Sequence, residues 1–164
     1  MSDALRIHEA FQAGDLETLR SLAEDPSEFP NTPVFPITAY PLEYAIYHSP
    51  LPFIRTLIQL GADPSYEDEG SFPSLLAALS TEREDRFEIV ELLLDAGADI
   101  QQRGVNDWTP LHYAAARNDR KAVELLLARG ADPAARTRID DLTTPLEEAE
   151  RLGFHEVAEI LKRV

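Results

Sequence analysis

Residues 108–133 read WTPLHYAAARNDRKAVELLLARGADP, and this stretch has the signals of two helices joined by a short turn. Thr109 suits the N-cap of a first helix, and Pro110 suits its first turn, where no backbone donor is needed. Asn118 tolerates the left-handed backbone conformation that a tight turn requires. Residues 122–127 then place apolar side chains at helical spacing, and a glycine follows as a helix terminator. The stretch therefore predicts a helical hairpin.

The end of this stretch occurs three times in the chain with almost the same letters. The copies are LIQLGADP at residues 57–64, LLDAGADI at residues 93–100 and LLARGADP at residues 126–133. Their glycines, Gly61, Gly97 and Gly130, are 36 and 33 residues apart. Self-similarity at this period is the signature of a stacked repeat protein, whose usual product is an extended binding surface and not a catalytic pocket.

The unit at residues 108–133 closely resembles the ankyrin repeat, which has a TPLHxAA motif, a short turn, a hydrophobic second helix and a GAD ending. Here TPLH stands at residues 109–112, the paired alanines at 114–115 and GAD at 130–132. The resemblance implies an all-α fold, an ankyrin-repeat solenoid of stacked antiparallel helix pairs with projecting hairpin-like loops. It also implies that His112 braces its turn through hydrogen bonds.

The resemblance extends over nearly the whole chain, which we expect to form a single ankyrin-repeat domain at residues 1–164. We place approximate repeats at residues 3–25, 40–64, 72–100, 108–133 and 143–164, with the terminal two atypical. The third repeat has four extra residues, and the charged stretch at residues 80–86, between its helices, is the natural place for them. A solvent-exposed elaboration is the default interpretation of this insertion, and a partner contact is the alternative.

A proline-rich linker at residues 26–39 separates the first two repeats. Its prolines remove backbone donors and restrict the residues before them, so the segment should be extended and not helical. Phe29, Val34, Phe35 and Ile37 lie between the prolines. We expect the linker to fold back along the helices, where it either covers apolar surface or presents it.

Composition excludes several classes of ligand and chemistry. The formal net charge of −15 argues against nucleic acid or an anionic membrane as the main ligand, because either needs a basic surface. The absence of cysteine excludes disulfides and a thiol nucleophile, and it fits a reducing compartment. We expect a cytoplasmic monomer that binds a protein partner. The excess of arginine over lysine, 13 to 2, favours a bacterial source.

The negative charge is concentrated in the first half of the chain. Residues 1–82 contain three arginines and 13 acids, for a net charge of −10, whereas residues 83–164 have a net charge of −5. In the simplest interpretation this charge serves solubility. In a sharper interpretation it steers a basic partner toward the amino-terminal half.

The resemblance implies that a partner contacts the loop tips before each TPLH-like motif and the exposed side of the first helix, on the concave surface. The aligned positions are Val105, Asn106, Trp108 and Arg117 in the fourth repeat, Asp68, Glu69, Ser71 and Leu79 in the third, and Tyr47 and His48 in the second. The acidic tip at residues 67–70 is either a solvated turn or a docking point for lysine or arginine, since it lacks the alternating ligands of a calcium loop.

Trp108 is the chain's only tryptophan. Tryptophan is enriched at binding hot spots, where a desolvated ring can dominate the affinity. The ring equally suits packing against an adjacent loop of the repeat stack, because aromatic side chains serve cores and interfaces alike. Both interpretations are open from the sequence.

The sequence offers no signature of an enzyme. Its four histidines show no metal-ligand spacing, and no nucleophile elbow, phosphate loop or zinc-protease motif occurs. The glutamates at positions 147, 148 and 150 are interpreted as a solvated capping face of the last repeat. We predict no catalytic residue, no cofactor and no bound metal.

The predicted function is non-catalytic binding of a partner protein, as an adaptor or scaffold. The alternative is an acidic inhibitor or immunity-type protein that blocks a basic enzyme, in which case added salt weakens binding. Intrinsic catalysis is the least favoured hypothesis, kept because a fold alone does not exclude it.

Overall fold

The computed structural model describes residues 3–36, 39–66, 72–139 and 141–164. In these ranges the regular secondary structure consists of ten α-helices and one 3-10 turn, with no strand, which confirms the all-α prediction. The chain falls into two compact units. Unit 1 comprises Met1–Tyr66 and Thr81–Ala98, and unit 2 comprises Glu67–Ser80 and Asp99–Val164. No helix in the described ranges has both the length and the hydropathy to cross a membrane.

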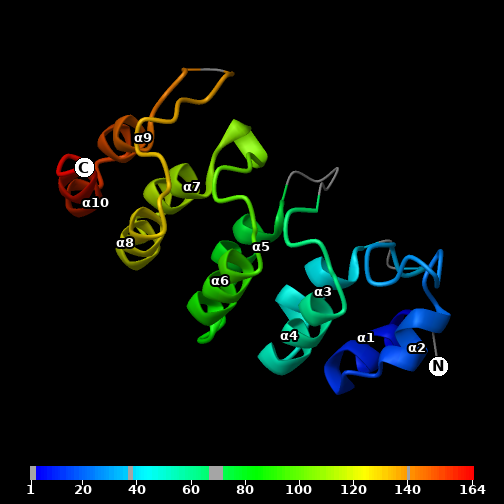
Figure 1. Ribbon diagram of the computed structural model, residues 1–164. Coiled ribbons are helices and arrows are strands. Elements are labelled where there is room, and N and C mark those ends of the chain that lie inside the picture. Colours follow the sequence, from blue (N-terminus) through cyan, green and yellow to red (C-terminus); the bar gives the residue numbers. More distant parts are fainter. Residues whose placement is uncertain (1–2, 37–38, 67–71, 140) are drawn as a thin grey trace. The chain divides into compact units, whose positions relative to one another are not determined.

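Unit 1 contains two helix pairs and one further helix. They are α1 (Asp3–Ala13) with α2 (Leu16–Ser21), α3 (Pro41–His48) with α4 (Leu51–Gln59), and α6 (Arg86–Asp95). Figure 1 shows the first pair in blue and the second in cyan. Because α1 packs on α3 and α4 packs on α6, equivalent helices of successive repeats are neighbours. Fully buried side chains of this core include Phe11, Leu19, Ile46, Ile54 and Ile89.

Unit 2 has the same kind of packing. Its helices are α5 (Ser74–Ser80), α7 (Pro110–Ala116) with α8 (Arg120–Ala128), and α9 (Pro145–Arg151) with α10 (His155–Leu161). A short 3-10 turn, η1 (Val105–Asp107), precedes α7. α7 packs on both α5 and α9, and α8 packs on α10. Its fully buried side chains include Leu76, Leu111 and Leu126.

The helix signals of residues 108–133 are confirmed. Thr109 caps α7 by accepting a hydrogen bond from the His112 main chain, and Pro110 occupies the first turn. Asn118 has a φ of 54° in the turn between α7 and α8, and Gly130 has a φ of 89° after α8. A Cβ at Gly130 would meet open space, so the left-handed backbone is the reason for glycine there.

Two of the four extra residues of the third repeat lie between its two helices, where the prediction placed all four, and a third lengthens α6 to 10 residues against 9 in α8. Residues 81–85 separate α5 from α6, whereas residues 117–119 separate α7 from α8. The default interpretation as a solvent-exposed elaboration is wrong for Arg83, whose side chain is 22% exposed. Its guanidinium pairs with Asp85 and donates a hydrogen bond to the main-chain carbonyl of Ser49. That carbonyl lies at the end of α3, where the helix supplies no further donors.

The proline-rich linker returns along unit 1, as predicted, and it is not helical. The prediction that it is extended is wrong for residues 26–30, which form turns closed by main-chain hydrogen bonds from Glu28 to Asp25 and from Asn31 to Glu28. The amide of Glu24, just before the linker, donates a hydrogen bond to the Pro33 carbonyl at 2.9 Å, which brings the linker back to the end of the first repeat. Val34 is fully buried, whereas the Phe35 ring is exposed. The linker therefore both covers and presents apolar surface. Ile37 lies outside the described residues.

Asn31 ties this linker to the GAD turn that follows α4. Its side-chain amide donates to the Gly61 carbonyl at 2.8 Å, and its side-chain oxygen accepts from the Asp63 amide at 2.8 Å. One side chain thus satisfies a donor and an acceptor of a turn that belongs to the next repeat.

Candidate functional site

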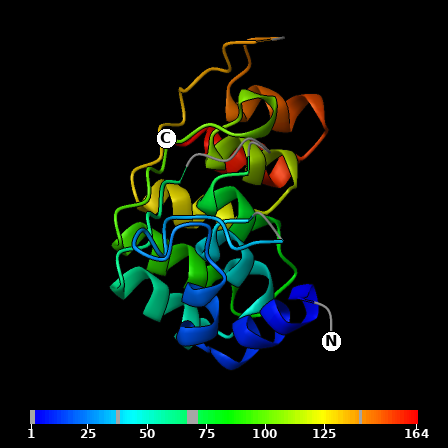
Figure 2. The same ribbon diagram turned by 90° about the vertical axis from the view of Figure 1, so that its right-hand side faces the viewer.

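Two loops of unit 2 project beyond the helices that follow them, as Figure 1 and Figure 2 show. We call residues 99–109, which lead into α7, the α7 finger, and residues 134–144, which lead into α9, the α9 finger. Each ends in a threonine, Thr109 or Thr144, that caps the following helix and precedes a proline. The sequence predicts partner contacts from the α7 finger, at Val105, Asn106 and Trp108, and names none in the α9 finger.

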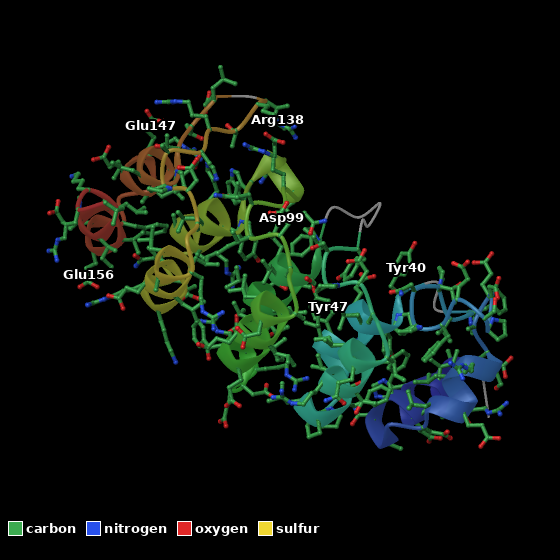
Figure 3. All side chains as sticks on the ribbon, viewed as in Figure 1. Tyr40, Tyr47, Asp99, Arg138, Glu147 and Glu156 are labelled. Atoms are coloured by element: carbon green, nitrogen blue, oxygen red, sulfur yellow. The ribbon has the colours of Figure 1, made fainter. Side chains whose placement is uncertain are left out.

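Asp107 joins the two fingers. Its carboxylate accepts hydrogen bonds from the main-chain N–H and the guanidinium of Arg138, each at 2.6 Å, and from Arg103 at 3.0 Å. Figure 3 places Arg138 on the orange α9 finger, beside the green η1 turn. The Asp107 side chain is only 9% exposed. Its hydrogen bonds with Arg138 above all hold its pKa below the ordinary value, so the group is a carboxylate at neutral pH.

His112 connects the start of α7 to the α9 finger. Its Nδ1 lies 2.8 Å from the Thr109 hydroxyl, and its Nε2 lies 2.9 Å from the Thr143 carbonyl oxygen. Because a carbonyl only accepts, Nε2 carries the proton, which leaves Nδ1 to accept from the hydroxyl. Burial lowers the His112 pKa and favours this neutral ring. The bracing role implied by the resemblance is confirmed.

Two glutamates of α9 extend the network of hydrogen bonds that Asp107 and His112 make with the α9 finger. Glu148 is 4% exposed, so its interpretation as a solvated side chain is wrong. It accepts a hydrogen bond from the Thr143 hydroxyl at 2.7 Å and pairs with Arg151. Burial raises its pKa, but these two partners outweigh burial and leave the pKa below its ordinary value. Glu147, labelled in Figure 3, completes the capping box of α9 with Thr144.

A small hollow of about 150 Å³ opens between the two fingers. Its walls are Asn106 and Trp108 from the α7 finger, Thr137, Ile139, Asp141 and Thr143 from the α9 finger, and Glu148 and Arg151 from α9. The structure thus brings the predicted residues Asn106 and Trp108 together with Glu148 and with residues of the α9 finger that the sequence did not single out. Residues 134–142 of the α9 finger fall between the predicted repeats at 108–133 and 143–164, so the repeat pattern marks no contact there.

Trp108 and Arg117 contact the same ring, that of Tyr113. The Trp108 ring stands edge-on to Tyr113 with 6.5 Å between centroids, and the Arg117 guanidinium carbon lies 5.5 Å from the Tyr113 centroid. Phe72 adds a second edge-on contact at 6.1 Å. Trp108 is half-buried, so it packs within its own unit and also lines the hollow. The structure therefore shows the packing role of this ring, and its role as a binding hot spot stays a prediction.

The other predicted residues of these repeats differ in accessibility. Val105 is half-buried in η1. Leu79 is a buried core side chain of α5, so it is not part of an accessible surface. Asp68, Glu69 and Ser71 lie outside the described residues.

Tyr47 and His48 are exposed near the end of α3 in unit 1, where Figure 3 labels Tyr47. They adjoin a ring cluster that the sequence did not predict. Nδ1 of His8 lies 2.9 Å from the Tyr44 hydroxyl, and the rings of His8 and His48 are 5.6 Å apart. The His48 ring packs against the His8 and Tyr44 rings, and this partial desolvation, followed by the charges of His8 and Arg83, lowers the His48 pKa although the residue is exposed on the whole.

A periodicity signal was available for this cluster. His8 and Tyr44 are 36 residues apart, close to the repeat period, and they lie on first helices of successive repeats. Two histidines do not make a metal centre. Within the described ranges, no group of three or more His, Cys, Asp or Glu side chains is placed to hold a metal ion.

Comparison with known proteins gives a family match and several relatives. The family model of ankyrin repeats in three copies matches residues 74–163. Alpha-latroinsectotoxin-Lt1a of Latrodectus tredecimguttatus is 39% identical over 104 residues, which is 62% of this chain and 7% of that protein. The putative E3 ubiquitin-protein ligase XBAT34 of Arabidopsis thaliana is 33% identical over 112 residues, 66% of this chain and 28% of that protein.

Ankyrin repeat protein nuc-2 of Neurospora crassa is 34% identical over 102 residues, which is 62% of this chain and 9% of that protein. The chain therefore spans less than a third of each of these three relatives.

Proposed function

The chain belongs to the ankyrin repeat family, and on this premise we propose that it is a non-catalytic module that binds a partner protein through its fingers and first helices. Ankyrin repeats are generally protein–protein interaction modules, and the family is typically non-enzymatic. The observation that carries the proposal is the hollow between the α7 and α9 fingers, with Trp108 in its wall.

The hollow suits one side chain of a partner protein. Its volume of about 150 Å³ is below the 300–1,000 Å³ that is usual for drug-sized ligands. Ile139 of the α9 finger is exposed and lines the hollow with Trp108, so it adds apolar surface there. A half-buried tryptophan with apolar neighbours is typical of a hot spot, since a partner that covers it removes the last water from the ring and leaves it fully desolvated.

The hydrogen bonds that hold the two fingers together favour binding of a partner without rearrangement of the fingers. Asp107 fixes the α7 finger to the α9 finger, and His112 fixes the start of α7 to the same finger. Both contacts are made within unit 2 before any partner arrives. Pre-organisation of this kind raises affinity because less conformational freedom is lost on binding.

In unit 1 the proposed contacts are Tyr47 and His48, which are exposed on α3. Their rings suit a cationic side chain, because the face of an aromatic ring attracts a lysine or arginine. The net charge of −10 in residues 1–82 supports the same partner chemistry. We propose a basic protein as the partner, a monomeric state for the chain, and a cytoplasmic location consistent with the lack of cysteine.

An acidic inhibitor or immunity-type protein that blocks a basic enzyme is the second candidate function. The net charge of −15 favours it, because complementary charge accelerates association and salt screens it. The two candidates differ in outcome. An inhibitor abolishes the activity of its partner at one-to-one stoichiometry, whereas an adaptor leaves that activity in place.

The test begins with capture of partners from a lysate at low salt and continues with calorimetry on the purified partner. Trp108→Ala should weaken binding about 30-fold or more, the scale of a hot spot. Leu152→Ala is the matched control, since Leu152 is an exposed apolar side chain that does not line the hollow. Equal affinity of the wild type and Trp108→Ala would refute the fingers as the binding surface.

A further inference from the structure

Unit 1 contains a larger groove that shares no residue with the surface proposed above. It has a volume of about 480 Å³ and opens between α2, the proline-rich linker and the end of α4. Leu16, Pro26, Phe29 and Leu60 give it an apolar lining, and Glu17 and Arg20 stand in its wall. Figure 1 shows the light-blue linker beside α2, the second blue helix.

The linker wall of this groove is fixed in place. Asn31 holds the linker to the turn after α4 through hydrogen bonds to Gly61 and Asp63. Phe29 is buried, and the Arg20 guanidinium lies over its ring at 5.9 Å. The groove is therefore a built feature of the fold and does not depend on a ligand to form.

Leu60 is the residue that a folding role does not explain. It is 46% exposed and faces the groove from the C-cap of α4. The equivalent C-cap positions of α6 and α8 are Ala96 and Arg129. The repeat therefore accepts a small or a charged residue here, and the leucine in this repeat adds apolar surface to the groove.

The charge around the groove is strongly negative. Residues 15–30 and 60–63 contain a single cation, Arg20, and six acids, all of them exposed. The acids are Asp15, Glu17, Glu24, Asp25, Glu28 and Asp63. In the wall itself Glu17 and Arg20 have opposite charges, so the excess of acids comes from the segments that flank the groove. An apolar groove flanked by acidic segments is complementary to a peptide whose apolar side chains are flanked by basic ones.

We propose that this groove binds a short segment of a partner protein in which one or two apolar side chains are flanked by lysine or arginine. The apolar side chains enter between Leu16 and Leu60, where they remove exposed apolar surface from water. The basic flanks lie along the rim, where Glu17 is the acid that also lines the groove. The volume falls within the range of pockets that enclose a ligand, which fits two side chains better than one.

The test is selection of peptides from a randomised twelve-residue display library on the full-length chain, followed by affinity measurement of the selected peptides. We expect sequences that combine large apolar residues with flanking lysine or arginine. Leu60→Arg should weaken these peptides about tenfold or more, because it removes the apolar floor and adds a repelling charge. Arginine is compatible with the fold at this position, since Arg129 occupies it in the fourth repeat.

Matched controls isolate the groove from general effects. Ala96→Arg adds the same charge at the same repeat position but does not line the groove. Glu17→Lys should weaken binding of the peptides, whereas Glu88→Lys should not. The two glutamates are matched because each lies in the first turn of the second helix of its repeat, Glu17 in α2 and Glu88 in α6. Amide chemical shifts of Ser21 and Leu60 should move when a selected peptide is added to isotope-labelled protein.

The outcome separates this proposal from the finger site. Trp108→Ala should leave the affinity of the selected peptides unchanged. Peptides without basic residues, equal binding by Leu60→Arg and Ala96→Arg, or failure to enrich any sequence would each overturn the groove proposal. Peptides that depend on Trp108 and not on Leu60 would overturn it while supporting the fingers as the binding surface.

Discussion

The carboxylate of Asp107 and the guanidinium of Arg138 meet at 2.6 Å across 31 residues of sequence, and this contact joins one finger to the next. Asp107 also accepts the Arg138 main-chain N–H, so the contact fixes the backbone of the α9 finger as well as a side chain. The geometry of the hollow depends on it, since Asn106 and Ile139 of the hollow are the sequence neighbours of these two residues.

Replacing Asp107 with asparagine should lower the free energy of unfolding by about 1–2 kcal/mol, because charged hydrogen bonds become neutral ones. Asparagine tolerates the left-handed backbone at this position, where φ is 56°, so the change isolates charge from backbone strain. Urea denaturation measures the effect. Glu124→Gln breaks only an exposed ion pair within α8 and should change stability much less. Equal effects of the two substitutions would contradict a special role for Asp107.

His112 predicts a dependence of stability on pH. Burial holds its folded-state pKa below the value of about 6.5 expected in the unfolded chain. Above that value both states are neutral and the stabilisation is complete. As the pH falls through 6.5 toward the folded-state pKa, His112 becomes protonated in the unfolded chain while it stays neutral in the folded chain. The unfolded state is therefore favoured, and stability is lost.

Comparison with His112→Gln isolates this effect from the other titrating groups. The variant should be less stable than the wild type by about 1–2 kcal/mol at pH 7.5, because the bridge from Thr109 to Thr143 is impaired. The difference should shrink as the pH is lowered from 7.5 to 5, since only the wild type loses stability through this ring. A difference that stays constant with pH would show that the ring does not titrate as proposed.

Trp108 should contribute more to binding than to folding. Trp108→Ala removes one edge-on contact with Tyr113, and aromatic pairs of this kind contribute about 0.5–1.5 kcal/mol beyond their buried area. Leu111→Ala, in the fully buried core of α7, should cost about 2–5 kcal/mol. Thermal and urea unfolding of both variants measure the contrast. If the two substitutions destabilise equally, Trp108 is a core residue.

Asn31 should control the stability of the linker. Asn31→Ala leaves the Gly61 carbonyl and the Asp63 amide without their side-chain partners, so hydrogen exchange of the Asp63 amide should accelerate. The amides at the centre of α8 should exchange at their original rate. Ser27→Ala, in an exposed turn of the same linker, serves as the control. Unchanged exchange at Asp63 would mean that the linker is held by its other contacts.

The parts of the fold that sequence predicted are those with local causes. Local causes determine the roles of Thr109, Asn118 and Gly130. Each role concerns the main chain at the residue itself or within four residues of it, so the residue type is enough to predict it. The bracing role of His112 came from the family resemblance, and its partner Thr143 lies one repeat away.

What the sequence missed are contacts between successive repeats. Arg83 reaches the end of α3 across 34 residues, and His8 reaches Tyr44 across 36. Such pairs can be predicted only by aligning neighbouring repeats in space, because the sequence around one residue does not indicate which residue of the next repeat it contacts. Glu148 was misjudged for a related reason, since its acidic neighbours suggest solvent while its partner Thr143 lies in the finger before the helix.

The clamp made by Asn31 bears on how this protein can be rearranged by recombination. Repeat arrays change length when whole units are duplicated or deleted, and such changes are tolerated when each unit carries its own turns. The GAD turn of the second repeat depends on an asparagine supplied by the linker before that repeat. A break anywhere between residues 31 and 61 would separate the turn from Asn31. Residues 31–63 therefore have to be kept together when repeats are duplicated, deleted or exchanged. The joints of a shortened or recombined repeat array should lie outside this segment.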